Sequence, residues 1–291
     1  MPFLARTKIL LTLLGVALMS GGVFLWVRDS DEASEAQFRN SQALYAEVPA
    51  TASSTADALA TSTANMPVPI LVYHIVRPAY PTDSRAVTAL AHTPQVFDAE
   101  MKYLGDAGYR VTTFVALEAH LRDGAPLPAN PVNISFDDGW SDQFTYAFPI
   151  LEKYHYPATF FVFTNPIGHH GFLSWNDLRV MLAAGMTIGS HTRSHPFLTK
   201  ITDPARLWDE IDGSKVTLER NLGIAVNEFA YPFGQYDPAI IRLVEKAGYQ
   251  AARGDALSRN AAAPTLSQLY MLGALNAPTT TAAFMLRFPQ R

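Results

Sequence analysis

Short segments rich in β-branched and aromatic residues alternate with amphipathic segments from residue 70 onward. We predict strands at residues 70–73, 110–113, 132–136, 159–163, 186–190, 228–231 and 250–253, with 270–275 as a further candidate. Helices are predicted between them, at residues 95–107, 114–122, 142–154, 175–184, 204–221 and 238–247. This alternation predicts the α/β class, with a parallel sheet wrapped by helices, because parallel strands need crossover connections.

The strand predicted at residues 132–136 runs directly into Asp137, Asp138 and Gly139. Adjacent carboxylates repel each other, and keeping both ionised near a core is costly unless a cation or strong donors lie close by. A bound metal ion is the simplest way to satisfy them, and Gly139 would let the backbone turn tightly there. The same three residues are also typical of an ordinary turn between a strand and a helix, so both interpretations stay open.

Two histidines follow the strand predicted at residues 186–190. His191 and His195 are four positions apart, so one turn of helix after the strand would place both imidazoles on the same face. With one carboxylate they form a ligand set for a divalent ion. Zn²⁺ suits this set and leaves a position for water, but non-haem Fe(II) oxygenases also use two histidines and a carboxylate. The ligands alone therefore leave the reaction open.

With these motifs the chain resembles the polysaccharide deacetylases, the carbohydrate esterase family 4 enzymes that share the NodB homology domain. The resemblance covers residues 67–289, and three segments carry it: Phe136-Asp-Asp-Gly139, His191-Thr-Arg-Ser-His195 and Phe229-Ala-Tyr-Pro-Phe-Gly234. Residues 71–76 and 157–162 are similar to the branch that includes poly-N-acetylglucosamine deacetylases. The resemblance implies an irregular (β/α) barrel of about seven parallel strands, with the motifs at the C-terminal ends of strands.

The resemblance also implies a role for individual residues. Asp138, His191 and His195 match the metal ligands, and Asp137 matches the general base that takes a proton from water. The implied ion is Zn²⁺, with Co²⁺, Ni²⁺ or Fe²⁺ as alternatives. The third motif lines one wall of the family's groove, and the backbone N–H of Phe233 matches a donor to the oxyanion. We expect substrate contacts from the third motif and from the end of the first strand, at Tyr231, Pro232, Phe233, Gly234 and His74.

Two positions depart from the family pattern. Ala230 stands where many relatives have an arginine that orients the general base, and we expect Arg253 to replace it. No histidine follows His195, so the histidine that often acts as general acid is missing as well. These departures motivate a second hypothesis, a non-catalytic glycan-binding protein on the same fold. A third hypothesis, Fe(II)-dependent oxidation, is disfavoured by the resemblance.

The N-terminal region differs in composition from the rest. Residues 9–27 are a 19-residue apolar stretch without a charged side chain, preceded by Arg6 and Lys8. Such a stretch is just long enough to cross a bilayer as a helix, and the alternative for residues 1–28 is a cleaved signal peptide. The lack of a clean Ala-x-Ala cleavage site favours the anchor. Residues 29–66, rich in Ala, Ser and Thr, are predicted to be a flexible linker to a deacetylase-like domain at residues 67–291.

Charge and cysteine content exclude several classes of protein. The net charge of −4 gives no basic footprint for nucleic acid, and the absence of cysteine excludes disulfides, thiol catalysis and Cys-ligated zinc. The expected partner is an N-acetylated glycan polymer of the cell envelope or extracellular matrix. We expect a membrane-anchored protein with its catalytic domain outside the cytoplasm, or a secreted one if the N-terminal segment is cleaved. His92, away from the motifs, is expected at the surface. Glycan linkage and oligomeric state do not follow from the sequence.

Overall fold

A computed structural model of the chain describes residues 68–255 and 268–291, all within the domain predicted at residues 67–291. The predicted anchor or signal segment at residues 1–28 and the predicted linker at residues 29–66 lie outside the described residues. Within the two described ranges, none of the helices combines the length and apolar character that a membrane crossing requires.

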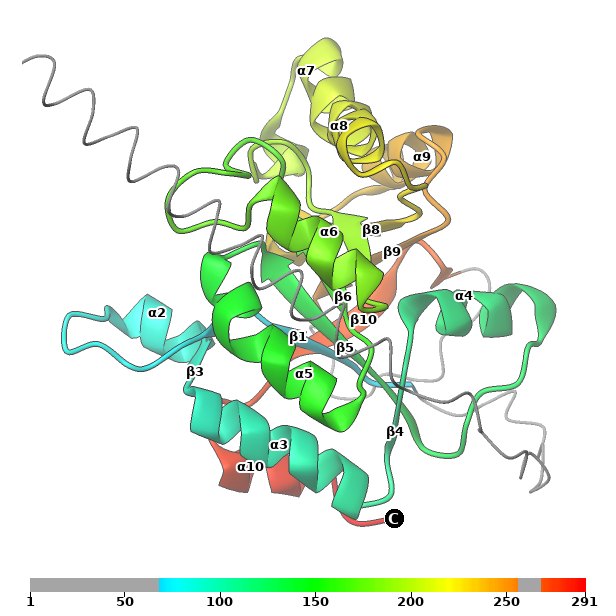
Figure 1. Cartoon of the computed structure of the whole chain (residues 1–291). Helices are drawn as coiled ribbons and strands as arrows, with labels where there is room; N and C mark the ends of the chain where they lie inside the picture. The colour runs from blue at the N-terminus through cyan, green and yellow to red at the C-terminus, as the bar shows by residue number, and fades with distance from the viewer. Residues whose placement is uncertain (1–67, 256–267) are drawn as a thin grey trace, which may run out of the picture. The chain divides into compact units, whose positions relative to one another are not determined.

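Seven parallel strands form a closed ring, which confirms the predicted barrel (Figure 1). In ring order they are β1 (Ile70–Tyr73), β10 (Leu272–Asn276), β9 (Ala251–Asp255), β8 (Glu228–Ala230), β7 (Thr187–Ser190), β6 (Thr159–Val162) and β5 (Pro131–Asp138). β1 closes the ring by pairing with β5 as well, with Ile70 opposite Asn133 and Tyr73 opposite Phe136. β4 (Arg110–Thr112) pairs with the first residues of β5, and β2 (Ile75–Val76) pairs with β3 (Ala91–His92) in a separate ladder.

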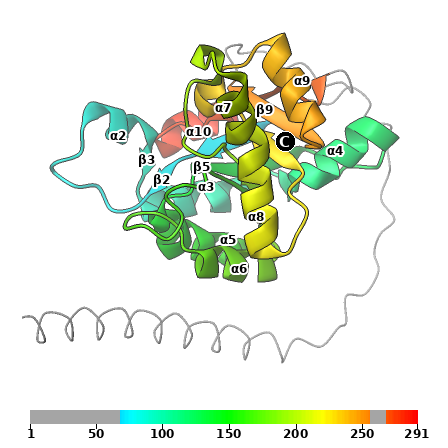
Figure 2. The same ribbon diagram turned by 90° about the horizontal axis from the view of Figure 1, so that it is seen from above.

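All six predicted helical stretches are present, and two of them contain a π-helical turn. The stretch predicted at 142–154 is η1 (Gln143–Ala147) followed by α5 (Phe148–Tyr154). The stretch predicted at 204–221 is divided into α7 (Pro204–Trp208), η3 (Asp209–Gly213) and α8 (Ser214–Leu222). The others are α3 (Pro94–Asp106), α4 (Phe114–Asp123), α6 (Trp175–Ala183) and α9 (Pro238–Lys246). Seen from two directions, α3 lies beside α5 and α10 (Thr281–Arg287), and α6 beside α8 (Figures 1 and 2).

Several helix ends follow directly from local sequence. The Thr93 side chain accepts a hydrogen bond from the backbone N–H of Val96, and Pro94 occupies the first helical position of α3. Ser174 and Asp177 form a reciprocal capping box at the start of α6. Because each cap satisfies backbone donors that the helix leaves free, these short polar signals locate the helices accurately.

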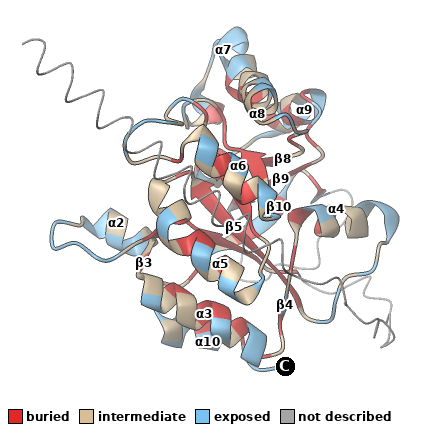
Figure 3. Cartoon of the chain, viewed as in Figure 1, coloured by how far each residue is buried: buried red, intermediate tan, exposed pale blue. Residues whose placement is uncertain are grey.

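The strands of the ring are buried on both faces, as is usual for parallel sheets, except for β10, where Gly273 and Asn276 are exposed (Figure 3). Alternate residues contribute to two apolar clusters, one of which packs against the helices and includes stacked Phe136 and Phe160, with ring centroids 4.6 Å apart. The other includes Phe161, Ala230 and Ala274 from β6, β8 and β10. Burial of all but the last residue of β5 holds that strand firmly in place.

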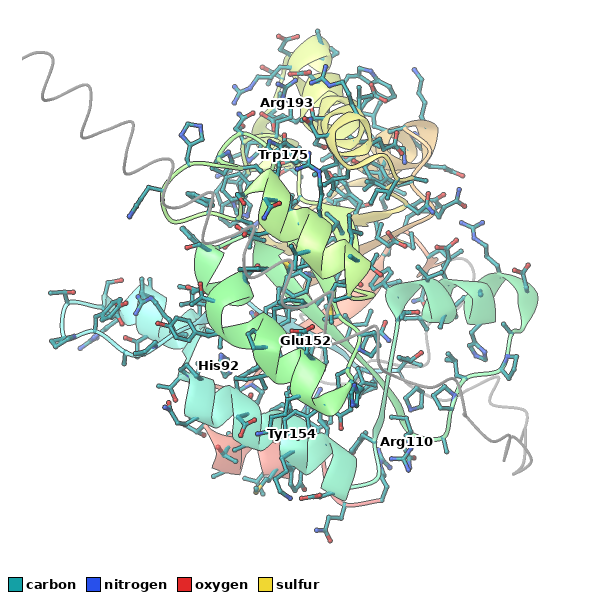
Figure 4. The ribbon with its side chains drawn as sticks, in the orientation of Figure 1. His92, Arg110, Glu152, Tyr154, Trp175 and Arg193 are labelled. Atoms are coloured by element: carbon teal, nitrogen blue, oxygen red, sulfur yellow. The ribbon has the colours of Figure 1, made fainter. Side chains whose placement is uncertain are left out.

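The surface prediction for His92 is wrong. Its side chain is only 2% exposed and lies next to α3 (Figure 4), with Nε2 3.1 Å from the carbonyl oxygen of Pro278 and 4.0 Å from Oε1 of Glu100. Tyr73 packs edge-on against its ring and donates a hydrogen bond to Glu100 Oε2. Burial of a polar group among polar neighbours leaves no periodic signal in the sequence, which explains the error.

Candidate active site

The residues predicted to act as general base and metal ligands lie at or just after the C-terminal ends of the ring strands, as predicted. Asp137 and Asp138 end β5, while His191 follows β7 directly. Asp138 is opposite Val162 of β6, and Val162 is opposite Ser190 of β7, so strand register alone brings Asp138 and His191 to the same level of the barrel.

The chain turns sharply as it leaves β5. Asp138 and Gly139 both have positive φ angles, 74° and 76°. A Cβ atom at position 139 would lie 2.9 Å from Cγ1 of Val162, so the backbone approaches β6 more closely than a side chain allows. The predicted need for glycine at this turn is confirmed, and the turn aims the Asp138 carboxylate toward the histidines.

Asp138, His191 and His195 each offer one ligand atom, and these atoms lie within 4.8 Å of one another. Asp138 Oδ1 is 3.4 Å from His195 Nε2 and 3.8 Å from His191 Nε2. His191 Nδ1 lies 2.7 Å from the carbonyl oxygen of Ala230, which assigns the proton to Nδ1 and leaves Nε2 free to bind a cation. Burial lowers the pKa of His191 to about 4, so its imidazole is neutral. This donor set fits a divalent metal ion.

The predicted turn of helix between the two histidines is wrong. Residues 191–195 form a loop in which Thr192 and His195 have φ angles of 73° and 56°. The hydroxyl of Thr192 accepts a hydrogen bond of 3.0 Å from the backbone N–H of His195. These two left-handed residues bring the imidazole rings together, with their centroids 4.7 Å apart. The two histidines are therefore neighbours, as predicted, but a loop and not a helical turn places them.

Asp137 is buried, and its carboxylate is surrounded by nitrogen atoms. Arg253, itself only 1% exposed, donates a hydrogen bond from Nη2 to Asp137 Oδ1, so the expected contact is confirmed. Asp137 Oδ2 lies 3.9 Å from His74 Nε2 and 4.0 Å from His191 Nε2. Burial by itself would raise the pKa of Asp137, but the positive charge of Arg253, the largest opposing influence, brings it below its ordinary value. The carboxylate is therefore ionised near neutral pH.

The residues of the third motif differ in their access to solvent. Tyr231 is buried, and its hydroxyl donates a 3.0 Å hydrogen bond to the carbonyl oxygen of Tyr270; Pro232 is buried as well. Phe233 is 46% exposed and has a positive φ angle of 57°. Its ring stacks on Phe197 with centroids 3.8 Å apart and meets His195 edge-on at 4.5 Å. Of the four predicted contacts in this motif, Phe233 presents the most exposed surface beside the histidines, while Gly234 is half-buried.

One aromatic and one acidic side chain also contact the site. Trp140 donates a hydrogen bond of 3.1 Å from Nε1 to Asp138 Oδ2 and stacks on Phe172 at 4.6 Å. Glu210, from η3, accepts hydrogen bonds from the backbone of Arg193 and Ser194 in the loop between the histidines. No sequence motif marks Glu210, because its partners are backbone groups.

Residues 124–252 match the family model described as polysaccharide deacetylase. The chain carries a polysaccharide deacetylase domain. The deacetylase domain resembles the YxkH protein of Bacillus subtilis (strain 168), with 31% identity over 183 residues, which are 63% of this chain and 62% of the relative. The chain thus spans less than two thirds of the length of that relative.

Two further comparisons bear on the deacetylase domain. It is 25% identical to the poly-β-1,6-N-acetyl-D-glucosamine N-deacetylase of Staphylococcus aureus (strain MRSA252), over 69% of this chain and 76% of that protein. The solved structure of the Streptococcus pyogenes deacetylase PplD in complex with acetate superposes with a TM-score of 0.69 and 23% identity, covering 78% of this chain and 100% of that chain. At this identity the second comparison supports the barrel fold alone.

Proposed function

We propose that this protein is a metal-dependent hydrolase that removes N-acetyl groups from an N-acetylglucosamine-containing polysaccharide of the cell envelope or extracellular matrix. The observation that carries the proposal is the convergence of Asp138, His191 and His195 beside the ionised carboxylate of Asp137. The Staphylococcus aureus relative, named for a poly-N-acetylglucosamine substrate, supports this class of glycan.

The three ligands suit Zn²⁺, with Co²⁺, Ni²⁺ or Fe²⁺ as alternatives, because two neutral imidazoles and one carboxylate leave an open position on a tetrahedral ion. When bound, such an ion lowers the pKa of a bound water and polarises the acetyl carbonyl. The hydrogen bond from His191 Nδ1 to Ala230 and that from Trp140 to Asp138 Oδ2 orient the ligand atoms toward one another.

Asp137 takes a proton from the attacking water. Arg253 engages Oδ1 of this carboxylate, so Oδ2 is the oxygen that receives the proton. Arg253 thereby supplies the contact that the arginine missing at Ala230 would have made. One of the two departures that motivated the non-catalytic glycan-binding hypothesis is therefore compensated within this chain.

The departing amine needs a proton, and His74 is the side chain that we propose to supply it. Its Nε2 lies 3.9 Å from Asp137 Oδ2, and its side chain is 17% exposed. Gln143 Nε2 donates hydrogen bonds to the backbone carbonyls of His74 and Asp137, of 2.8 Å and 2.6 Å, and so ties the two residues together. A histidine at the end of the first strand thus replaces the one that the late part of the chain lacks.

Substrate contacts are proposed for the third motif. The backbone N–H of Phe233 stabilises the tetrahedral oxyanion, a contribution typically worth about 3 kcal/mol of barrier. The exposed face of the Phe233 ring packs against a sugar ring, while Tyr231, Pro232 and Gly234 hold the segment in position. Backbone strain at Phe233, a bulky residue with positive φ, is consistent with a functional position.

We also propose that residues 9–27 anchor the protein in a membrane, with the deacetylase domain outside the cytoplasm. Support comes from the uncharged apolar stretch in the sequence and from the class of substrate, an envelope or matrix polymer. Cleavage of the segment would give a secreted protein instead.

Acetate release from β-1,4- and β-1,6-linked N-acetylglucosamine oligomers tests the proposal directly. The metal-depleted full chain is assayed before and after addition of Zn²⁺ or Co²⁺, with Asp137→Asn as the control. We expect metal-dependent release that the control lacks, and the preferred oligomer identifies the linkage. Glycan binding without any acetate release, in the presence of bound metal, would instead favour the non-catalytic hypothesis.

A further inference from the structure

The loop between the two histidine ligands has no regular structure of its own to hold it. Thr192 and His195 both adopt left-handed conformations, which residues with a side chain rarely take unless their surroundings impose them. Apart from the hydrogen bond of 3.0 Å from the His195 N–H to the Thr192 hydroxyl, this conformation depends on contacts from outside the loop.

Partners on opposite sides satisfy the backbone of this loop. The carbonyl oxygens of Thr192 and Arg193 accept hydrogen bonds of 3.1 Å and 2.9 Å from the N–H groups of Thr164 and Asn165, which follow β6. The N–H groups of Arg193 and Ser194 both donate to Glu210 Oε2, at 3.0 Å and 2.9 Å. A single carboxylate thus accepts both amides from the side away from β6.

Glu210 is well suited to hold backbone amides. Its other oxygen, Oε1, accepts a short hydrogen bond from the hydroxyl of Ser194, so both carboxylate oxygens are engaged by the loop. The residue is only 6% exposed, and hydrogen bonds to an ionised acceptor are stronger than those between neutral groups. Two consecutive N–H groups that converge on one anion form a compact, directional clamp.

The segment that carries Glu210 is itself fixed to the barrel. Ser214 donates to the carbonyl oxygen of Ile211 within η3, and its hydroxyl lies 2.8 Å from that of Ser190, the last residue of β7. Tyr249 also donates a 3.0 Å hydrogen bond to the Ile211 carbonyl. Because Ser190 directly precedes His191, the same strand end holds one metal ligand and anchors the helix that clamps the other.

We propose that Glu210 is a positioning residue of the metal site: it holds residues 192–194 so that His195 meets His191 and Asp138. This inference rests on the proposed metal-dependent function. Asp209 provides a matched control, because it contacts the same loop only through an exposed side-chain pair, with Arg193 Nη1 2.8 Å from Asp209 Oδ1. Arg193 lies beside the α7–α8 segment in Figure 4, and the Asp209 side chain is 60% exposed.

The test measures the affinity of the full chain for Zn²⁺ by competition with a chromophoric chelator, in wild type, Glu210→Ala, Glu210→Gln and Asp209→Ala. We expect Glu210→Ala to weaken Zn²⁺ binding 10- to 100-fold, as loss of an outer partner of a ligand typically does. Glu210→Gln keeps an acceptor oxygen and should recover part of the loss, while Asp209→Ala should bind as wild type does. In acetate release, Glu210→Ala should lower kcat at limiting Zn²⁺ with little change in KM, and excess Zn²⁺ should restore it.

If Glu210 only stabilises the fold, a different pattern is expected. Glu210→Ala would then lower the urea midpoint of the metal-free protein and leave the Zn²⁺ affinity of the folded fraction unchanged. That pattern, or equal affinity in Glu210→Ala and Asp209→Ala, would overturn the inference. If Glu210→Ala does not fold, wild-type affinity in both Glu210→Gln and Ser194→Ala would overturn it as well. A wild-type chain that binds no Zn²⁺ would refute the metal site, and the role of Glu210 with it.

Discussion

Replacing Arg253 with methionine removes the guanidinium that contacts Asp137 and leaves a side chain of similar length. Arg253 and Asp137 are 1% and 5% exposed, so water cannot take the place of the lost donor. Removing one partner of a buried ion pair costs about 3–5 kcal/mol of folding free energy. His74 Nε2 stays 3.9 Å from the carboxylate and offsets part of the loss, which puts the expected cost near the lower end, about 3 kcal/mol.

A double-mutant cycle separates the pair from its surroundings. Asp137→Asn leaves Arg253 buried without its anion, at a similar cost of about 3 kcal/mol. The double variant buries neither charge. Its loss of folding free energy should therefore be about 2–3 kcal/mol smaller than the sum of the losses in the two single variants. Lys153→Met breaks an ion pair between Lys153 and Asp98 whose side chains are 56% and 37% exposed, and it should change stability little.

Urea unfolding of the metal-free chain, followed by circular dichroism and by fluorescence, measures all four variants. With a slope of about 2–3 kcal/mol per molar urea, each single substitution of the buried pair should lower the midpoint by roughly 1 M. A coupling free energy below about 0.5 kcal/mol would mean that the two buried charges act independently, and the reasoning would be refuted.

Three further predictions concern single positions. Gly139→Ala should destabilise the domain by about 1–3 kcal/mol, because alanine must adopt positive φ and its Cβ would lie 2.9 Å from Val162; an unchanged melting temperature contradicts this. Burial raises the pKa of Glu100 to about 8 from an ordinary 4.5, so the folded state keeps a proton that the unfolded state has released, and stability falls as pH rises toward 8. Glu100→Gln should reduce that fall in urea midpoints measured between pH 6.5 and 8. His74→Gln should lower kcat for acetate release by about 100-fold with little change in KM; a loss of Zn²⁺ affinity would point to a different role.

The barrel could be predicted because its strands are short apolar runs separated by amphipathic helices, and polar motifs mark the strand ends. The elements that were missed lack such signals. β2 and β3 have two residues each, too few for any periodicity, and α2 (Arg85–Leu90) buries none of its residues. Of α10 only Phe284 is buried, so its amphipathic pattern is weak.

The site was predictable to the extent that its residues signal their own chemistry. Paired carboxylates and paired histidines indicate a cation, whereas Arg253 was expected only because Ala230 stands where the related family has an arginine. Backbone conformation carries no such signal: the left-handed Thr192 and His195 replace the helical turn that their spacing suggests. Glu210 was missed because it recognises main-chain amides, which every residue type provides.

The closure of the ring by β1 has a consequence for how this chain can be shortened. β1 is hydrogen-bonded to both β10 and β5, yet neither β1 nor β10 lies within residues 124–252, the part that matches the family model. A fragment limited to those residues would leave β5 with a row of unpaired backbone groups and would cut β9 after its second residue, Ala252. Exposed edge strands are templates for pairing between chains, so we expect such a fragment to aggregate. The smallest piece that keeps every strand of the ring paired must include both β1 and β10.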